Sequence, residues 1–299
     1  MNADLHCHST VSDGLLSPSA LVERAHANGV DLLALTDHDE LAGLPEARAR
    51  AEALGMGFVD GAELSVSWCD ETVHIVGLGF DPTHPALVAG LKQVRDGRDT
   101  RAQRMSDDLA RIGIRGVFEG AMRYVGNPAL ISRSHFARYL VEIGVARDVA
   151  NVFEHYLVRG KPGFVEHEWA SLDDALGWIH AAGGLAVIAH PGRTRCAKAD
   201  LVRLFERFKD MGGEAIEVVS GTQSGADALE FARVARRYGF LASRYSRLAG
   251  WVAAGALLFM PRPFGDAHVA GTDMPGLHDP RHFAIEDRCD GFGCAVARR

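Results

Sequence analysis

The sequence predicts an α/β protein, a β/α barrel interrupted by a helical insertion. In the first third of the chain, short apolar runs of the buried, parallel-strand type alternate with amphipathic helical stretches, and this alternation returns near residue 163. Between about residues 82 and 162, one helical pattern follows another. The length of 299 residues suits one barrel of roughly 200–250 residues plus an insertion.

Residues 1–81 are expected to form the first part of the barrel. Ser17 followed by Pro18 predicts an N-cap and a first helical residue, and Gly29 predicts the end of that helix. The other elements expected here are a buried strand over 31–36, a helix over about 40–54, and strands over 58–66 and 72–80.

Residues 82–162 are expected to form an Arg-rich helical insertion at the barrel mouth, and residues 163–243 the second part of the barrel. Ser171 and Asp174 have capping-box spacing, with Asp in place of Glu, at the start of a helix that a glycine pair ends. The elements expected next are a strand over 185–190, a helix over 198–211, a strand over 215–220, a helix over 225–238 and a strand over 240–242.

Composition excludes several classes of partner. The net charge of −7 gives no global attraction to double-stranded nucleic acid or to an anionic membrane. The longest apolar run, Trp251 to Met260, is about half a membrane span. Five scattered cysteines without a CxxC pair indicate a reducing compartment, so we expect a cytoplasmic protein. The oligomeric state stays open.

Side chains of metal-ligand type lie in or at the ends of successive predicted strands. Each motif alone is ambiguous, because strand histidines can face solvent and polar clusters can cap helices. Their coincidence at the rim where barrels carry their active sites favours a metal cluster, since a buried polar group without a partner costs about 1–3 kcal/mol. Cys7, between two of the histidines, should point away from them and pack in the core. The residues concerned are His6, His8, His38, Glu63, His74 and His190.

The mixture of imidazole and carboxylate suits two to three divalent ions, with Mn²⁺ preferred and Fe²⁺ or Zn²⁺ as alternatives. Glu63 could bridge two of them. Such ions generate hydroxide near neutral pH and neutralise phosphoryl oxygens, and this chemistry needs no covalent nucleophile. We therefore expect hydrolysis of a phosphate ester.

The motifs DLHCHSTVSDG, LLALTDHD, DGAELSV, VHIVG and IAHPGR resemble those of the polymerase and histidinol phosphatase (PHP) family, over residues 3–243. RAQRM, ISRSHFARYLVE and YLVRGKPGFV resemble the subgroup that contains 3′,5′-nucleoside bisphosphate phosphatases and a 5′→3′ exoribonuclease. The resemblance implies a distorted (β/α)7 barrel, a trinuclear metal centre, and an insertion that closes over the substrate.

By the same resemblance, each ion has its own ligands. His6, His8 and Glu63 would hold the first ion, Glu63, His74 and His190 the second, and Asp13 and His38 would contribute to the third. His38, Asp13 and Arg193 are the expected catalytic residues, with His38 assisting proton transfer to the leaving oxygen and Arg193 neutralising charge.

Cationic side chains in the matching segments are the expected contacts to the phosphates of a nucleotide, because Arg offers a bidentate fork and Lys a point charge. The alternative for Arg101 and Arg104 is a solvated helix face. The candidates are Arg101, Arg104, Arg133, His135, Lys161 and Arg193.

The chain departs from the family after Ser243. Members follow their last strand with a GSDxH-like motif that supplies two ligands, whereas here the sequence continues RYSRLAGW. The nearest substitutes would be Asp266 with His268, or Asp273 with His278. Our hypothesis is that residues 244–299 form an aberrant tail read out of frame.

The expected substrate is a nucleoside 3′,5′-bisphosphate that loses its 3′-phosphate, or a short RNA trimmed from its 5′ end. One alternative is a histidinol-phosphate phosphatase, although the Arg-rich insertion favours nucleotides. The other is a metal- or nucleotide-binding module with impaired catalysis, because the Asp-x-His ligands are missing.

Overall fold

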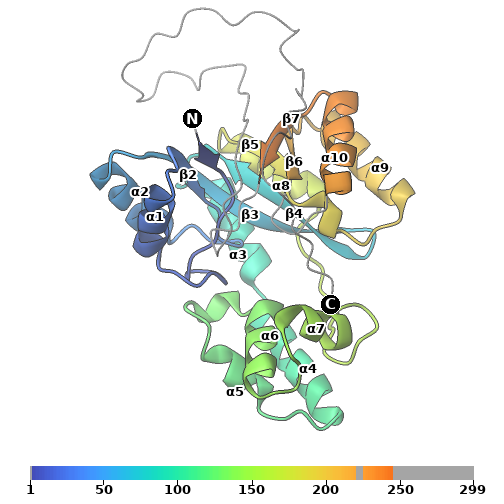
Figure 1. Ribbon diagram of the computed structural model, residues 1–299. Helices are drawn as coiled ribbons and strands as arrows, with labels where there is room; N and C mark the ends of the chain where they lie inside the picture. The colour runs from blue at the N-terminus through green and yellow to red at the C-terminus, as the bar shows by residue number, and fades with distance from the viewer. Residues whose placement is uncertain (1, 220–224, 245–299) are drawn as a thin grey trace, which may run out of the picture. The chain divides into compact units, whose positions relative to one another are not determined.

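A seven-stranded sheet forms the main body of the protein in the computed structural model, which describes residues 2–219 and 225–244 (Figure 1). The strands lie in the order of the sequence and curl into a half-barrel, the distorted barrel that the sequence predicts. They are β1 (Ala3–Asp4), β2 (Leu32–Leu35), β3 (Gly57–Trp68), β4 (Glu71–Leu78), β5 (Leu185–Ile188), β6 (Ala215–Val219) and β7 (Leu241–Arg244).

The sequence pattern predicts parallel strands throughout, but one strand of the sheet is antiparallel to its neighbours. β4 runs antiparallel to both β3 and β5, while the other pairs are parallel. The reason lies in the link between β3 and β4, because Cys69 and Asp70 both have positive φ, +47° and +61°. Two such residues make the tight turn that joins antiparallel strands.

The first strand is also shorter than expected, so His6 and His8 follow it instead of ending it. Regular pairing with β2 stops at Asp4, but the chain continues beside β2 through the bond from the Thr36 amide to the Cys7 carbonyl, 2.9 Å. The Cys7 thiol lies in the core, 3.1 Å from the Ala34 carbonyl oxygen, as predicted.

Helices cover the sheet with their apolar faces. The first of them starts as expected, because the Ser17 hydroxyl accepts a bond from the Ala20 amide at 3.3 Å and Pro18 follows. Among the largest fully buried side chains of this core are Leu33, Leu64 and Ile75. The helices are α1 (Pro18–Ala27), α2 (Leu44–Ala53), α3 (Pro85–Arg95), α8 (Leu172–Ala181), α9 (Lys198–Asp210) and α10 (Gly225–Tyr238).

The helical stretch in the middle of the chain has a second apolar core of its own, which includes Met105, Leu109 and Phe136. Leu87 and Leu91 of α3 belong instead to the core of the sheet. The division at residues 82 and 162 thus stays a proposal. The elements of this stretch are α4 (Arg98–Arg111), α5 (Val117–Met122), η1 (Pro128–Leu130), α6 (Arg133–Glu142), α7 (Val149–Val152) and η2 (Phe153–Leu157).

No helix within residues 2–219 and 225–244 is long and apolar enough to cross a membrane. The proposed aberrant tail lies outside the described residues from residue 245 onward. So do the candidate substitutes for the missing ligands, Asp266, His268, Asp273 and His278.

Candidate metal centre

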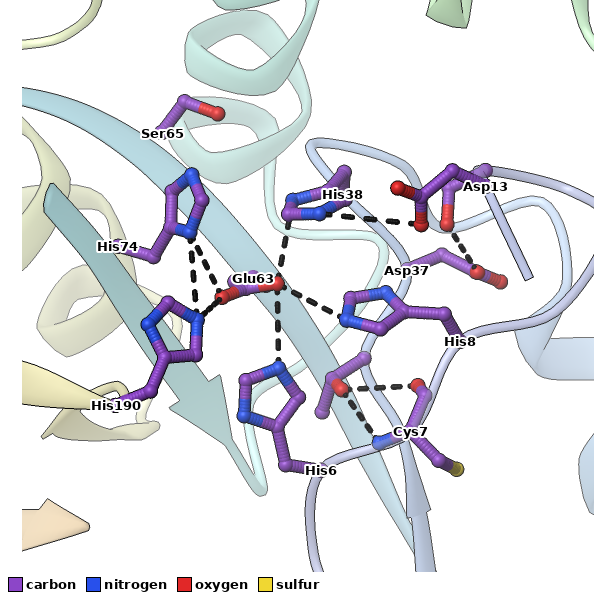
Figure 2. A network of polar contacts seen from close by, with 12 residues as sticks. His6, Cys7, His8, Asp13, Asp37, His38, Glu63, Ser65, His74 and His190 are labelled. Atoms are coloured by element: carbon purple, nitrogen blue, oxygen red, sulfur yellow. Dashed lines mark hydrogen bonds and ion pairs between the residues drawn. The ribbon is translucent and has the colours of Figure 1, made fainter. Parts of the chain in front are cut away.

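Glu63, in the middle of β3, lies at the centre of a group of five imidazoles (Figure 2). Its side chain is 1% exposed. The sheet order explains the convergence, because the histidines come from the segments after β1, β2 and β5 and from β4 itself. Ligand-type side chains predicted at separate strands therefore do gather at one place.

The two oxygens of Glu63 face different imidazoles. Oε1 lies 2.7 Å from Nε2 of His190 and 3.0 Å from Nδ1 of His74. Oε2 has three imidazole neighbours: Nε2 of His6 at 3.2 Å, Nε2 of His8 at 3.0 Å and Nδ1 of His38 at 3.2 Å. A carboxylate placed in this way can bridge two ions.

The five rings follow one another in a closed circle around the carboxylate. From His6 the ring centroids are separated by 5.1 Å to His8, 4.6 Å on to His38, 4.9 Å to His74, 5.2 Å to His190 and 5.6 Å back to His6. Among the residues that the structure describes, two sets have ligand atoms close enough to hold an ion each: His6, Glu63 and His190, and His8, His38 and Glu63.

Hydrogen bonding alone does not satisfy this cluster. A carboxylate has about four acceptor positions, fewer than the imidazole nitrogens directed at it. Oε2 of Glu63 is buried and accepts no hydrogen bond of ordinary geometry, despite three nitrogens within 3.2 Å. Divalent cations resolve this, because they accept the lone pairs of carboxylate and imidazole together. The donor set therefore fits borderline ions such as Mn²⁺, Fe²⁺ or Zn²⁺.

Asp13 completes the set of seven predicted ligands. Its Oδ1 lies 3.9 Å from Nε2 of His38. Burial would raise the pKa of Asp13, but His38, His8 and the Ser134 hydroxyl together hold it below its usual value. Asp13 is therefore a carboxylate near neutral pH, as a metal ligand must be.

The loop that carries Asp13 is held by Asp37, a buried residue at the end of β2 (Figure 2). Asp37 accepts bonds from the amide of Ser9 at 2.7 Å and from the hydroxyls of Ser9 and Ser12, both at 2.6 Å. Asp37 thus has a structural role next to the candidate ligand His38, which the motif TDHD alone did not reveal.

The electrostatics of the centre favour cation binding. Burial would raise the pKa of Glu63, but the surrounding imidazoles, His38 first, hold it well below its usual value. Burial lowers the pKa of His38 to about 3, so this ring is neutral at pH 7. Although burial opposes it, Glu63 and Glu217 raise the pKa of His6 well above its usual value. An ion that binds His6 must therefore displace a proton.

Glu217 of β6 is a residue of this site that sequence reasoning missed. It is 1% exposed, and its Oε1 lies 2.6 Å from Nδ1 of His6. Its Oε2 accepts a bond from the backbone amide of His190, also at 2.6 Å. A glutamate inside the apolar run AIEVV was the available signal.

Asp39 and Arg98 were also missed. Asp39 is completely buried and accepts bonds from the amide and hydroxyl of Ser65 at 2.8 and 2.9 Å. The guanidinium of Arg98, at the start of α4, pairs with the same carboxylate. This pair joins the loop after His38 to the helical insertion.

Buried cations gather beside that ion pair. Arg98 and Arg101 both lie over the ring of Trp169, with guanidinium carbons 4.5 and 5.2 Å from its centroid. Arg101 is 7% exposed, which rules out a solvated helix face at that position. Burial, with repulsion from Arg133 and Arg98, lowers the pKa of Arg101 to about 9. An anion bound near Arg101 would relieve the repulsion within this cluster.

The other predicted contacts are placed differently. Arg133 is half-buried, with Nη1 3.3 Å from the Leu157 carbonyl oxygen. His135 is fully buried, and its Nδ1 accepts the Ser132 amide at 3.0 Å. Arg193 is exposed in the short helix η3 (Pro191–Arg193) after His190. Arg104 and Lys161 are exposed on the insertion. The roles assigned to all of these residues remain proposals.

Several relatives match most of the chain, among them a phosphatase and an exoribonuclease. The chain is 54% identical over 242 residues to the 3′,5′-nucleoside bisphosphate phosphatase of Chromobacterium violaceum, which covers 81% of this chain and 85% of the relative. It is 41% identical over 255 residues to a 5′-3′ exoribonuclease of Haemophilus influenzae, which covers 84% of this chain and 92% of the relative.

A solved structure has the same fold. It is an amidohydrolase from Chromobacterium violaceum with bound sulfate and no metal, similar to this chain with a TM-score of 0.80 and 53% identity. The match covers 82% of this chain and 87% of the other. A model of the PHP domain matches residues 4–159. Since this match spans about half of the chain and the relatives align with most of it, the protein belongs to the PHP domain family.

Proposed function

We propose that this protein is a metal-dependent phosphatase that removes the 3′-phosphate from nucleoside 3′,5′-bisphosphates. The observation that carries the proposal is the presence of two neighbouring features that could each hold a phosphate. One is the cluster around Glu63, which would bind phosphate through its ions, and the other is a group of cations formed by the buried Arg98 and Arg101 and the half-buried Arg133. A substrate with two phosphates on one nucleoside matches such a pair.

The link between the two features is short. Asp39 follows the ligand His38 directly, and its amide bonds to the carbonyl of Glu63 at 3.0 Å. The carboxylate of Asp39 pairs with Arg98, whose neighbour Arg101 contacts the same Trp169 ring. The geometry therefore supports one phosphate at the ions and a second near Arg101.

The seven candidate ligands would hold two to three ions, with Mn²⁺ as the preferred metal. When bound, these ions supply an activated water and neutralise charge on the phosphoryl group. The chain's own side chains orient the substrate, and the buried guanidinium of Arg101 fixes the second phosphate in this scheme. Because burial lowers the pKa of His38 to about 3, its ring is neutral at pH 7 and suits ion binding better than proton donation to the leaving oxygen.

The names of the relatives support a nucleotide substrate, and the exoribonuclease among them supports 5′→3′ trimming of short RNA as a second reaction at the same site. We do not propose double-stranded nucleic acid or a membrane as a partner. Cys7, Cys69 and Cys196 are unpaired, which fits the reducing cytoplasm as the place of action.

An assay with adenosine 3′,5′-bisphosphate and Mn²⁺ tests the proposal. We expect release of phosphate with adenosine 5′-monophosphate as the product, and no release after chelation of the metal. Release from histidinol phosphate but not from the bisphosphate would replace this function with the alternative one. Metal binding without turnover of either substrate would support the catalytically impaired module.

The sequence after Ser243 bears on that last outcome. In β7, Ser243 lies opposite Glu217 of β6, so the chain reaches the rim of the metal centre where the family places its Asp-x-His ligands. We propose that the reading frame changes near codon 244. Resequencing of the coding DNA tests this, and a frame confirmed through codon 244, with no other frame encoding GSDxH, would contradict it.

A further inference from the structure

We propose that Cys69 and Cys196 form a reversible disulfide when the protein meets hydrogen peroxide, and that this bond fastens the β3–β4 turn to the segment between η3 and α9. Neither thiol is among the candidate metal ligands, and none of the roles proposed above uses them. The inference is independent of the proposed substrate, because it rests on the positions of the two sulfurs.

Cys69 lies in the two-residue turn between β3 and β4. Its positive φ of +47°, together with that of Asp70, fixes the backbone of the turn and the point from which the Cys69 side chain starts. The residue is exposed, and its Sγ lies 3.7 Å from Nη2 of Arg203 in α9. An exposed sulfur beside a guanidinium is the kind of cysteine that a small oxidant reaches.

Cys196 lies in the segment before α9 and is half-buried. Its Sγ is 3.7 Å from the carbonyl oxygen of Trp68, and this oxygen belongs to the peptide group that leads to Cys69. Burial, followed by the neighbouring Cys69 thiol, raises the pKa of Cys196 to about 11. The two sulfurs are therefore close enough to influence one another, although the residues are far apart in the sequence.

Further contacts hold the two backbones together. Nε1 of Trp68 donates to the carbonyl oxygen of Asp200, in the first turn of α9, at 2.9 Å. The guanidinium of Arg203, on the same helix, contacts both the Asp200 carboxylate and the Cys69 sulfur. A disulfide requires Cα atoms within about 7 Å of each other. Because the turn and the start of α9 are joined in this way, the bond needs little movement of the backbone.

Two other interpretations of these thiols fit less well. Two carboxylates also lie near Cys196, so a zinc site is one alternative. Within the part of the chain that the structure describes, however, both groups with ligand atoms close enough for an ion are built on Glu63. The other alternative is a thiol that only packs in the core. Cys7 is of this kind, at 4% exposed, whereas Cys69 faces solvent.

The oxidation proceeds in two steps. The sulfur of Cys69 attacks one oxygen of hydrogen peroxide, so that an S–O bond forms as the O–O bond breaks, and the thiol proton leaves with the other oxygen as water. The sulfur of Cys196 then attacks the resulting sulfenic acid, and the S–S bond forms as the S–O bond breaks. The departing hydroxide takes up the Cys196 proton and leaves as a second water. In total the thiols lose two electrons and two protons, and the peroxide is reduced to water.

The bond restrains a segment that follows the candidate ligand His190. Residues 194–197 connect η3 with α9, and Arg193 and Arg195 are both exposed there. In a reducing compartment such a disulfide is transient, because cellular dithiols reverse it by thiol–disulfide exchange. Transient redox sensing is a usual role of the few disulfides that cytosolic proteins form.

Mass spectrometry of the full chain tests the pairing. The protein is treated with hydrogen peroxide, its remaining thiols are blocked with iodoacetamide after denaturation, and the unreduced chain is digested. We expect a peptide pair joined through Cys69 and Cys196, with the loss of two hydrogen atoms, that separates in dithiothreitol. Cys7 is the internal control and should carry the iodoacetamide label. Cys69 joined to Cys289 or Cys294, or oxidised alone while Cys196 stays a thiol, would overturn the proposal.

Serine variants test the order of the two steps. In Cys196→Ser we expect a sulfenic acid at Cys69 that dimedone traps. In Cys69→Ser we expect Cys196 to stay a thiol at the same peroxide concentration, while Cys7→Ser should form the disulfide as the unmodified protein does. Oxidation of Cys196 at an unchanged rate in Cys69→Ser, or no trapped sulfenic acid in Cys196→Ser, would overturn the assignment of Cys69 as the first thiol to react.

Limited digestion with trypsin tests the effect on the segment. The oxidised chain should be cut after Arg193 and Arg195 more slowly than the reduced chain, whereas cleavage after Arg147, an exposed residue of the insertion, should not change. Equal cleavage of the two forms at Arg193 and Arg195 would overturn the fastening of this segment. Because none of these measurements uses turnover, failure of the phosphatase assay would refute the proposed substrate and leave this inference standing.

Discussion

Arg98 and Asp39 form a buried ion pair that ties the start of α4 to the loop that follows the candidate ligand His38. Arg98 is 5% exposed and Asp39 is fully buried. Asp39 also has a positive φ of +50°, so its loop adopts an unfavourable backbone next to the candidate ligand His38. The pair therefore connects the position of the insertion to the geometry of the ion site.

Removal of the Arg98 guanidinium should destabilise the protein strongly. Arg98→Met leaves the carboxylate of Asp39 buried without its cation, which typically costs about 3–5 kcal/mol. Urea unfolding of the metal-free protein measures this loss. Lys92→Met, which breaks an exposed pair with Asp96, should change the free energy of unfolding little. Equal effects of the two substitutions would contradict the structural role of Arg98.

Protonation of His135 should make the fold less stable in acid. Burial lowers the pKa of this ring to about 4, whereas a histidine in the unfolded chain titrates near 6.5. Between these values the unfolded state binds more protons than the folded one, so stability falls as the pH is lowered from about 6.5 to about 4. Protonation of this one group should lower the free energy of unfolding by about 3 kcal/mol in total.

His135→Gln tests that expectation, because glutamine at this position can keep the hydrogen bond to the Ser132 amide without titrating. Urea unfolding at pH 7 and pH 5 should show a smaller loss on acidification for the variant than for the unmodified protein. His26→Gln, at an exposed position of α1, is the control and should leave the loss unchanged. An identical pH dependence of all three proteins would refute the role of His135.

The sequence predicted the convergence of the candidate ligands better than the residues around them. The five candidate histidines stand in or after short apolar runs, and the curled sheet brings these positions together. His74 reaches the same place although β4 is antiparallel, because it lies in the first half of that strand. The antiparallel placement of β4 was not predicted, because a buried strand looks the same in either direction. Its turn uses Cys69 and Asp70, which lack the usual glycine signal.

The supporting residues were missed for a related reason. Glu217 alternates with apolar neighbours, so it resembles a strand residue that faces solvent. Arg98 stands in a run of charged residues at a helix start, which resembles a solvated face. Only the fold shows that both are buried, because their partners, His6 for Glu217 and Asp39 for Arg98, lie far away in the sequence.

Arg101 should matter for a second phosphate more than for catalysis. Arg101→Leu removes a charge-assisted contact worth about 1.5–3 kcal/mol, so the KM for adenosine 3′,5′-bisphosphate should rise by about 10–100-fold. The KM for p-nitrophenyl phosphate, which has one phosphate, should change little. Arg111→Leu, on an exposed part of the same helix, serves as the control and should resemble the unmodified enzyme. If Arg101→Leu raised the KM for both substrates equally, Arg101 would not be a contact to the second phosphate.

Glu63 offers the most direct test of the account, because it is the one residue shared by both candidate ion-binding sets. The measurement is the number of Mn²⁺ ions bound per chain after dialysis, compared between the unmodified protein and Glu63→Gln. We predict at least two ions for the unmodified protein, one for each set, and fewer than one for the variant. An unmodified chain that retains no Mn²⁺, or a Glu63→Gln variant that retains as many ions, would contradict a metal centre built on this carboxylate.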